Sequence, residues 1–194
     1  MNLEERIYSV LVVSAAEKLN TALSSFLAQP RYGPVKIVSG VSSAKRALRE
    51  RDFDFVIVNS PLPDDTGLRF AIDTSSSGEA VTLLLVRAEL YDDITEKASE
   101  NGVFTLYKPL SRPIFSLALA WMESARERLR KIEKKTLSFE ERMEEIRLVN
   151  RAKWLLISEL KMDEPQAHRY IEKQAMDRCV SKREIAEEII RTYS

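Results

Sequence analysis

The sequence predicts a doubly wound α/β domain with a five-stranded parallel sheet, followed by a long coiled-coil helix and a small three-helix bundle. Three observations predict this. Short apolar runs alternate with amphipathic segments over residues 7–107. Between Pro113 and Pro165 there is neither glycine nor proline, and apolar residues recur there every three or four positions. Residues 139–194 hold three segments in which apolar residues recur at helical spacing.

The strands of the sheet are predicted from apolar runs that end at polar or turn-forming residues. They are Ile7–Val13, Val35–Val38, Phe55–Val58, Val81–Val86 and Phe104–Tyr107. The segments between these runs have helical spacing, as at residues 17–28, 42–51, 67–73 and 92–101. Such alternation indicates a parallel sheet with helices on both faces. Sheets of this kind bind ligands at the carboxyl ends of their strands.

Composition excludes several classes of protein. Lys plus Arg and Asp plus Glu are 30 each, so any nucleic-acid binding must come from a local patch. The only cysteine, Cys179, excludes a disulfide framework and favours a reducing cytoplasm. With the only histidine, His168, it is too little for a zinc site, so we expect no metal and no cofactor. No apolar run reaches the roughly 18 residues of a membrane span, and the acidic start is unlike a signal peptide.

Two motifs follow predicted strands. The segment DFVIVNSPLPDDTG, residues 54–67, places Asn59 four residues before Pro63, with Gly67 beyond it. The segment LYKPL places Lys108 and Pro109 after the fifth strand. Both motifs resemble the receiver domain of response regulators, which has a flavodoxin-like fold. The resemblance implies that a phosphorylated aspartate would stand at position 59 and that a conserved lysine stands at 108.

The phosphoryl-transfer chemistry of that family is not carried over. Asn59 has an amide where the phospho-acceptor carboxylate should be, and an amide is not a nucleophile. Ser14 and Ala15 stand where the family has carboxylates for magnesium, a cation that prefers such oxygens. Val86 replaces a hydroxyl residue, and only Lys108 remains. The sequence therefore predicts a degenerate receiver, or pseudo-receiver, controlled by a regulatory protein or ligand on this domain instead of by aspartyl phosphorylation.

A long helix is expected to start at Ser111, a good N-cap, with Pro113 in its first turn. Five of its first residues are available to pack on the sheet: Ile114, Phe115, Leu117, Ala118 and Trp121. A spacing of alternately three and four residues then predicts the seam of a left-handed coiled coil. The seam residues are Met122, Ala125, Leu129, Ile132, Thr136, Phe139, Met143 and Ile146.

Burying this seam requires a partner, and a homodimer is the simplest one. The alternative is a helix that breaks near 136–138 and folds back on its own chain. The charged residues between the seam positions, Arg126, Glu127 and Arg130 among them, are interpreted as a solvated helix face. The predicted domains are residues 1–121 (receiver-like), 122–138 (coiled-coil connector) and 139–194 (helical output domain).

The last segment contains two helix starts. Asp163 can cap a helix that has Pro165 in its first turn, and Ser181 with Glu184 forms a capping box. The order and spacing of six short elements here resemble the ANTAR family of RNA-binding transcription antiterminators. These elements are Ala152-Lys153, Leu155-Leu156, Ala167-His168, Ile171, Ala175-Met176 and Ile185-Ala186. The resemblance implies a dimer that binds hairpins in leader transcripts and prevents termination.

Side chains for RNA are available in this segment, since RNA loops are bound through stacked bases and phosphate contacts. Arg147, Arg151 and Lys153 are candidates for phosphates, with Lys153 the strongest. His168 and Tyr170 are candidates for stacking, and a second basic cluster comprises Arg178, Lys182 and Arg183. Trp154 is expected in the core or an interface, and Met176 in the core.

Two other functions fit the pattern less well: a DNA-binding transcription factor whose helices form a helix-turn-helix, and a protein-interaction adaptor. An enzyme is not expected, because the sequence shows no nucleophile-base pair, metal cluster or glycine-rich phosphate loop.

Overall fold

The computed structural model describes residues 6–78 and 80–193. The acidic residues at the start of the chain, Glu4 and Glu5, on which the signal-peptide prediction depends, lie outside these ranges. The chain forms two compact units, residues 1–130 and 131–194. Across the described ranges, no helix is both long and apolar enough to cross a membrane.

The first unit contains the predicted parallel sheet, with strand order β2-β1-β3-β4-β5. The strands are β1 (Tyr8–Val13), β2 (Tyr32–Val38), β3 (Phe55–Asn59), β4 (Val81–Arg87) and β5 (Phe104–Lys108). The helices of this unit are α1 (Glu17–Phe26), α2 (Val41–Glu50), α3 (Leu68–Ser76), the short η1 (Ala88–Leu90), α4 (Tyr91–Glu100) and the first part of α5 (Arg112–Leu160). This order confirms the doubly wound, flavodoxin-like fold predicted from the sequence.

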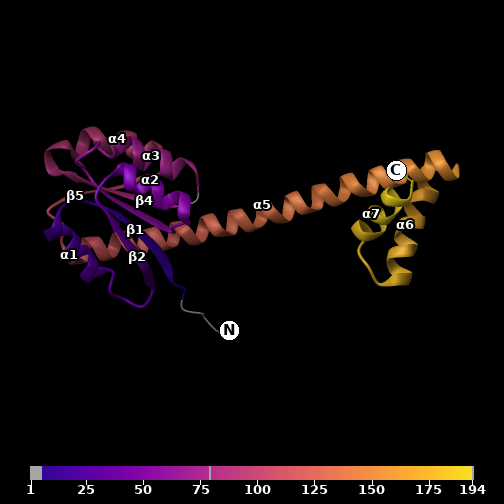
Figure 1. Cartoon of the computed structure of the whole chain (residues 1–194), viewed down its shortest axis with the longest axis horizontal. Helices are drawn as coiled ribbons and strands as arrows, with labels where there is room; N and C mark the ends of the chain where they lie inside the picture. The colour runs from indigo at the N-terminus through magenta and orange to yellow at the C-terminus, as the bar shows by residue number, and fades with distance from the viewer. Residues whose placement is uncertain (1–5, 79, 194) are drawn as a thin grey trace. The chain divides into compact units, whose positions relative to one another are not determined.

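Helices cover both faces of the sheet. Helices α2, α3 and α4 lie on one face, and α1 with the start of α5 lies on the other (Figure 1). Alternate residues of each strand serve the two faces, so that Val56 and Val58 belong to one core and Phe55 and Ile57 to the other. Every residue of β3 is buried, as expected for a central strand of such a sheet.

The start of α5 packs only partly as predicted. Phe115 and Ala118 are buried as expected, and Leu119 and Met122 are buried too. By contrast, Ile114, Leu117 and Trp121 are exposed. Ala125 and Leu129 pack against the core that contains Phe115.

We therefore correct the prediction of a seam open to a partner helix at three positions, Met122, Ala125 and Leu129. The residues of α5 that contact the sheet follow the same spacing of three and four as a coiled-coil seam, and the sheet already covers these three positions. For the same reason the first unit extends beyond residue 121, where we placed its boundary.

The second unit contains the end of α5 together with α6 (Glu164–Arg178) and α7 (Lys182–Tyr193). Their small core comprises Ala152, Leu156, Ala167, Ile171, Ala175, Ile185, Ala186 and Ile189. Both predicted caps are confirmed: Asp163 accepts a hydrogen bond from the amide of Gln166 at 2.7 Å, and Ser181 Oγ accepts one from the amide of Glu184 at 3.2 Å.

The connector is helical throughout, because α5 continues across residues 136–138 without the break that the alternative required. Its predicted seam residues Ile132, Phe139, Met143 and Ile146 are exposed. These four apolar side chains are the part of the predicted seam that remains available to a partner.

Candidate functional sites

At the carboxyl end of the sheet, Ser14, Asn59 and Lys108 form one hydrogen-bonded group. Asn59 Nδ2 donates to Ser14 Oγ at 3.1 Å. Lys108 Nζ donates to Asn59 Oδ1 at 2.7 Å and to the carbonyl of Ser60 at 2.6 Å. Burial, and secondarily the charge of Arg87, lowers the pKa of Lys108. The Asn59 amide and the Lys108 ammonium group are therefore hydrogen-bonded to each other at the position where a receiver would hold a phosphoryl group.

This group does not fit a magnesium ion. Ser14 Oγ already accepts hydrogen bonds from Asn59 and from the amide of Ala16 at 3.2 Å, and Ala15 has no ligand atom. Val86 is fully buried and has no hydroxyl. Within the described ranges, no cluster of three His, Cys, Asp or Glu residues could hold a metal.

The nearest carboxylates have structural roles instead. Asp64 accepts hydrogen bonds from the amides of Val41 and Ser42, both at 3.0 Å, and so caps α2 from a distant loop. These two amides lower the pKa of Asp64. Asp65 Oδ1 accepts a hydrogen bond from the amide of Gly67 at 2.6 Å, as aspartates commonly do in turns.

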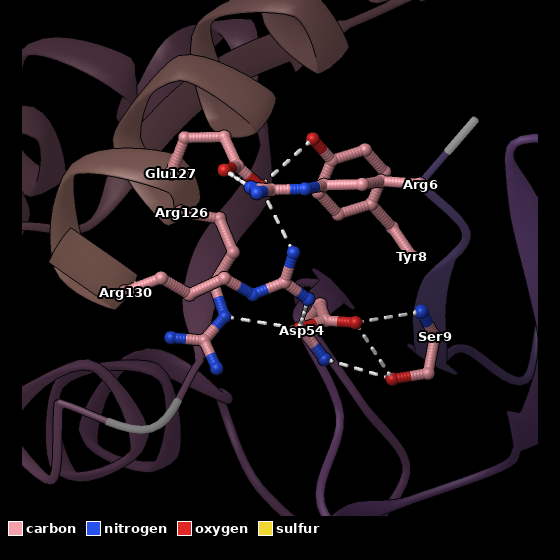
Figure 2. Close-up of polar contacts among 7 residues, drawn as sticks. All are labelled: Arg6, Tyr8, Ser9, Asp54, Arg126, Glu127 and Arg130. Carbon is pink, nitrogen blue, oxygen red and sulfur yellow. Dashed lines mark hydrogen bonds and ion pairs between the residues drawn. The ribbon is translucent and has the colours of Figure 1, made fainter. Parts of the chain in front are cut away.

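At the opposite end of β3 the structure shows a charged cluster that sequence reasoning missed (Figure 2). Asp54 Oδ1 accepts bonds from Arg126 Nε at 3.0 Å and Arg130 Nη2 at 2.7 Å. Its Oδ2 accepts from the amide and hydroxyl of Ser9 at 3.0 and 3.2 Å. The Asp54 side chain is only 13% exposed.

Burial on its own would raise the pKa of Asp54. The hydrogen bonds from Arg126 and Ser9, together with the charges of both arginines, outweigh it and lower the pKa.

Glu127 extends this cluster. It pairs with Arg130 at 2.9 Å and with Arg6, and it accepts a hydrogen bond from the hydroxyl of Tyr8 at 3.2 Å (Figure 2). Arg126, Glu127 and Arg130 thus fasten α5 to β1 and β3, and our interpretation of them as a solvated face is wrong. The only sequence signal was the spacing of four between two arginines, which is equally common on exposed helices.

In the second unit, most of the lysine and arginine side chains predicted to bind RNA are engaged in ion pairs. Lys153 pairs with Glu164 of α6 at 2.8 Å and lowers the pKa of that glutamate. The other pairs are Arg178 with Glu188 at 2.5 Å, Lys182 with Glu172 at 2.5 Å and Arg183 with Glu187 at 2.9 Å. His168 Nε2 lies 3.3 Å from a carboxylate oxygen of Glu172.

Three of the predicted side chains remain exposed without such a partner. Arg147 and Arg151 lie on the exposed side of α5, and no ion pair within the described residues involves either. Tyr170 is exposed on α6. Met176, which we expected in the core, is 78% exposed, and this corrects that prediction. Trp154, which we expected in the core or an interface, is 71% exposed, so it lies outside the core and adds an aromatic side chain to the surface of α5.

Comparison with known proteins agrees with both units. Residues 138–190 match the ANTAR domain family. The chain is 27% identical, over 94% of its length and 89% of the relative, to the transcriptional regulatory protein PdtaR from two strains of Mycobacterium tuberculosis.

The first unit is similar to solved receiver domains. One belongs to an HD domain-containing protein from Pseudomonas fluorescens Pf-5, with a TM-score of 0.57, 20% identity and coverage of 69% of this chain and 96% of that one. The chemotaxis response regulator CheY4 of Vibrio cholerae has a TM-score of 0.53, 18% identity and coverage of 60% and 98%. At such identities the similarity establishes the fold alone. The chain therefore contains an ANTAR domain at residues 138–190, preceded by a domain with the receiver fold.

Proposed function

We propose that this protein is an RNA-binding regulator of transcription antitermination. It acts as a homodimer, binds hairpins in leader transcripts, and is controlled by a regulatory protein or ligand on its receiver-like domain. The observation that carries the proposal is the match of residues 138–190 to the ANTAR domain. The similarity to a transcriptional regulatory protein over nearly the whole chain supports the same role and a non-enzymatic one.

The surface of the second unit supports RNA as the partner. Arg147 and Arg151 are separated by one helical turn and are exposed. Guanidinium groups placed in this way can contact adjacent phosphates through charge-assisted hydrogen bonds. The ion-paired Lys153, Arg178, Lys182 and Arg183 can contribute only if RNA displaces their glutamates. We therefore assign the main phosphate contacts to Arg147 and Arg151.

The receiver-like unit supports control without phosphorylation. Asn59 is 6% exposed and bonded on both sides, to Ser14 and to Lys108. A closed group of this kind has no acceptor for a phosphoryl transfer and no carboxylate for the metal that the transfer uses. An input must therefore act through binding to the domain surface.

Dimer formation is supported by the exposed apolar side chains of the connector. Burying Ile132, Phe139, Met143 or Ile146 is worth on the order of 1.5–3 kcal/mol each. Four such residues at spacings typical of a coiled coil favour pairing of two connectors.

The test is filter binding of the full chain to hairpin RNA and to duplex DNA across a salt series. Arg147→Ala/Arg151→Ala should weaken hairpin binding and reduce the slope of log affinity against log salt by about 2. A matched control is Lys18→Ala/Lys45→Ala, which removes the same charge from exposed positions of the first unit. Equal affinity for duplex DNA, or no salt-dependent hairpin binding, would contradict the proposed function.

A further inference from the structure

Trp154 lies on the exposed side of α5 in the second unit. Ala152 and Leu156, two residues before and after it, are fully buried in the core of this unit. Two residues correspond to about 200° around a helix, so Trp154 points almost directly away from that core. Its 71% exposure follows from this position. The indole thus contributes little to the folding of the unit and is available to a partner.

The neighbours of Trp154 indicate the chemistry of that partner. Arg147, Asn150, Arg151 and Ser158 lie seven, four and three residues before it and four after it, hence on the same side of α5. All four are exposed and none is acidic. Since no described residue forms a recorded ion pair with Arg147 or Arg151, this side of the helix carries net positive charge around a large aromatic plane.

An aromatic plane beside unpaired guanidinium groups is the combination that binds single-stranded nucleotides. Any unpaired base can stack on an aromatic side chain, because every base has a π-face, while arginines contact the phosphates on either side. A second copy of this chain fits the surface less well. A twofold dimer would place the same two arginines of each copy on the same interface, where like charges repel.

We propose that Trp154 is the stacking platform for an unpaired base in the RNA loop, with Arg147 and Arg151 on the flanking phosphates. The inference depends on the proposed RNA-binding function and makes it specific. The bound element is the unpaired loop of the hairpin, and its base-paired stem is not bound by this surface.

The chain itself provides a spectroscopic test, because it contains two tryptophans, Trp121 and Trp154. In a Trp121→Phe background the intrinsic emission reports on Trp154 alone. Titration with a hairpin RNA should quench this emission, because a stacked base contacts the indole. A stem-only duplex of the same sequence, closed without a loop, should leave it nearly unchanged.

Substitution gives the second readout. Trp154→Ala should weaken hairpin binding by between about 5-fold and about 150-fold, the range for loss of one stacked base. Trp154→Phe should recover most of the affinity, whereas Trp154→Leu, which is apolar but has no π-face, should not. The salt dependence should stay unchanged in all three, because no phosphate contact is removed. Circular dichroism checks that each variant keeps its helices.

The failures can be told apart. If the parent protein binds no hairpin RNA, the proposed function itself fails. Hairpin binding with unchanged Trp154 emission and unchanged affinity of Trp154→Ala would overturn the stacking role and leave the function standing. Sedimentation equilibrium tests a third outcome. If Trp154→Ala dissociates the dimer while Trp154→Phe and Trp154→Leu both retain it, the indole belongs to a protein interface and the proposal is overturned.

Discussion

At the scale of single residues, Asn59 carries an amide at the position where the resemblance to receivers implies a phospho-acceptor carboxylate. Its amide is held between Ser14 and Lys108, and all the nearby carboxylates that we identified serve as caps or turn residues. The degenerate character of this site could be read directly from the sequence, since it depends on residue types at motif positions. The hydrogen bonds that fill the site with Ser14, Asn59 and Lys108 could not, because they depend on how β1, β3 and β5 align.

We predict that neither the wild-type chain nor Asn59→Asp becomes phosphorylated by acetyl phosphate. The substitution supplies a carboxylate, but Ser14 and Ala15 still supply none for magnesium, without which the transferring phosphoryl charge is not neutralised. Intact-mass spectrometry measures the modification, with a phosphorylation-competent receiver as the positive control for the reagent. A phosphoryl adduct on the wild-type chain would refute our account of Asn59.

Asp54 leads to a prediction about pH. Its pKa is lowered in the folded protein, so its contribution to stability is complete above its unfolded pKa of about 3.9. That contribution is lost as the pH falls below 3.9 through the folded pKa. Asp54→Asn leaves Arg126 and Arg130 with an uncharged partner and should lower the free energy of unfolding by about 3 kcal/mol at pH 7.

Urea denaturation of wild type and Asp54→Asn at pH 7 and at pH 3 measures this difference. The difference in the free energy of unfolding should narrow at the lower pH, because pH 3 lies below the unfolded pKa of the aspartate and protonation of the unfolded wild-type chain removes part of the contribution of Asp54. The exposed neighbour Asp52 provides the control, because Asp52→Asn removes the same charge and should change stability little. A difference that is independent of pH would show that the ion pairs with Asp54 contribute nothing.

At the scale of elements, the strands were predictable and the partners of α5 were not. An apolar run such as Phe55–Val58 has few alternatives to a buried strand. The spacing of apolar residues along α5 is the same whether a sheet or a second helix covers them, so Met122 could not be distinguished from Ile146 by pattern alone. The ion pair of Lys153 could not be predicted for a similar reason: its partner Glu164 belongs to the next helix, beyond a turn that the sequence does not orient.

Helix α6 provides an element-scale prediction. Asp163 accepts from the amide of Gln166 at 2.7 Å, and Gln166 Oε1 accepts from the amide of Asp163 at 3.0 Å, which forms a reciprocal capping box. Asp163→Ala should lower the free energy of unfolding of the second unit by about 1 kcal/mol. Denaturation followed through the exchange of α6 amide hydrogens measures it. Asp163→Ser keeps a capping oxygen and should stay close to wild type, and if both variants lose the same amount the cap is not the cause.

At the scale of the whole molecule, the two units are joined by a helical connector that the chain itself leaves uncovered. The exposed residues Ile132, Phe139, Met143 and Ile146 belong to none of the three apolar cores. A monomer would leave these side chains in water, whereas two connectors side by side would bury them. The corrected seam, which starts at Ile132 and no longer at Met122, would make the proposed dimer independent of the residues that hold α5 on the sheet.

We predict that Phe139→Asp/Ile146→Asp makes the protein monomeric, since each substitution would bury an unpaired charge in the seam. Leu137 offers a matched control. It is as exposed as Phe139 but lies two residues earlier, about 160° around the helix from it, so Leu137→Asp should leave the dimer intact.

Sedimentation equilibrium gives the oligomeric state. Filter binding to a two-hairpin RNA then measures how much affinity is lost when the protein is monomeric. A monomer has one RNA-binding surface and loses the gain from binding both hairpins at once, which for linked sites is on the order of 100-fold or more. Its affinity for an isolated hairpin should be unchanged. A wild-type chain that is monomeric at every concentration, or a double variant that remains dimeric, would exclude the seam from Ile132 to Ile146 as the contact between two copies.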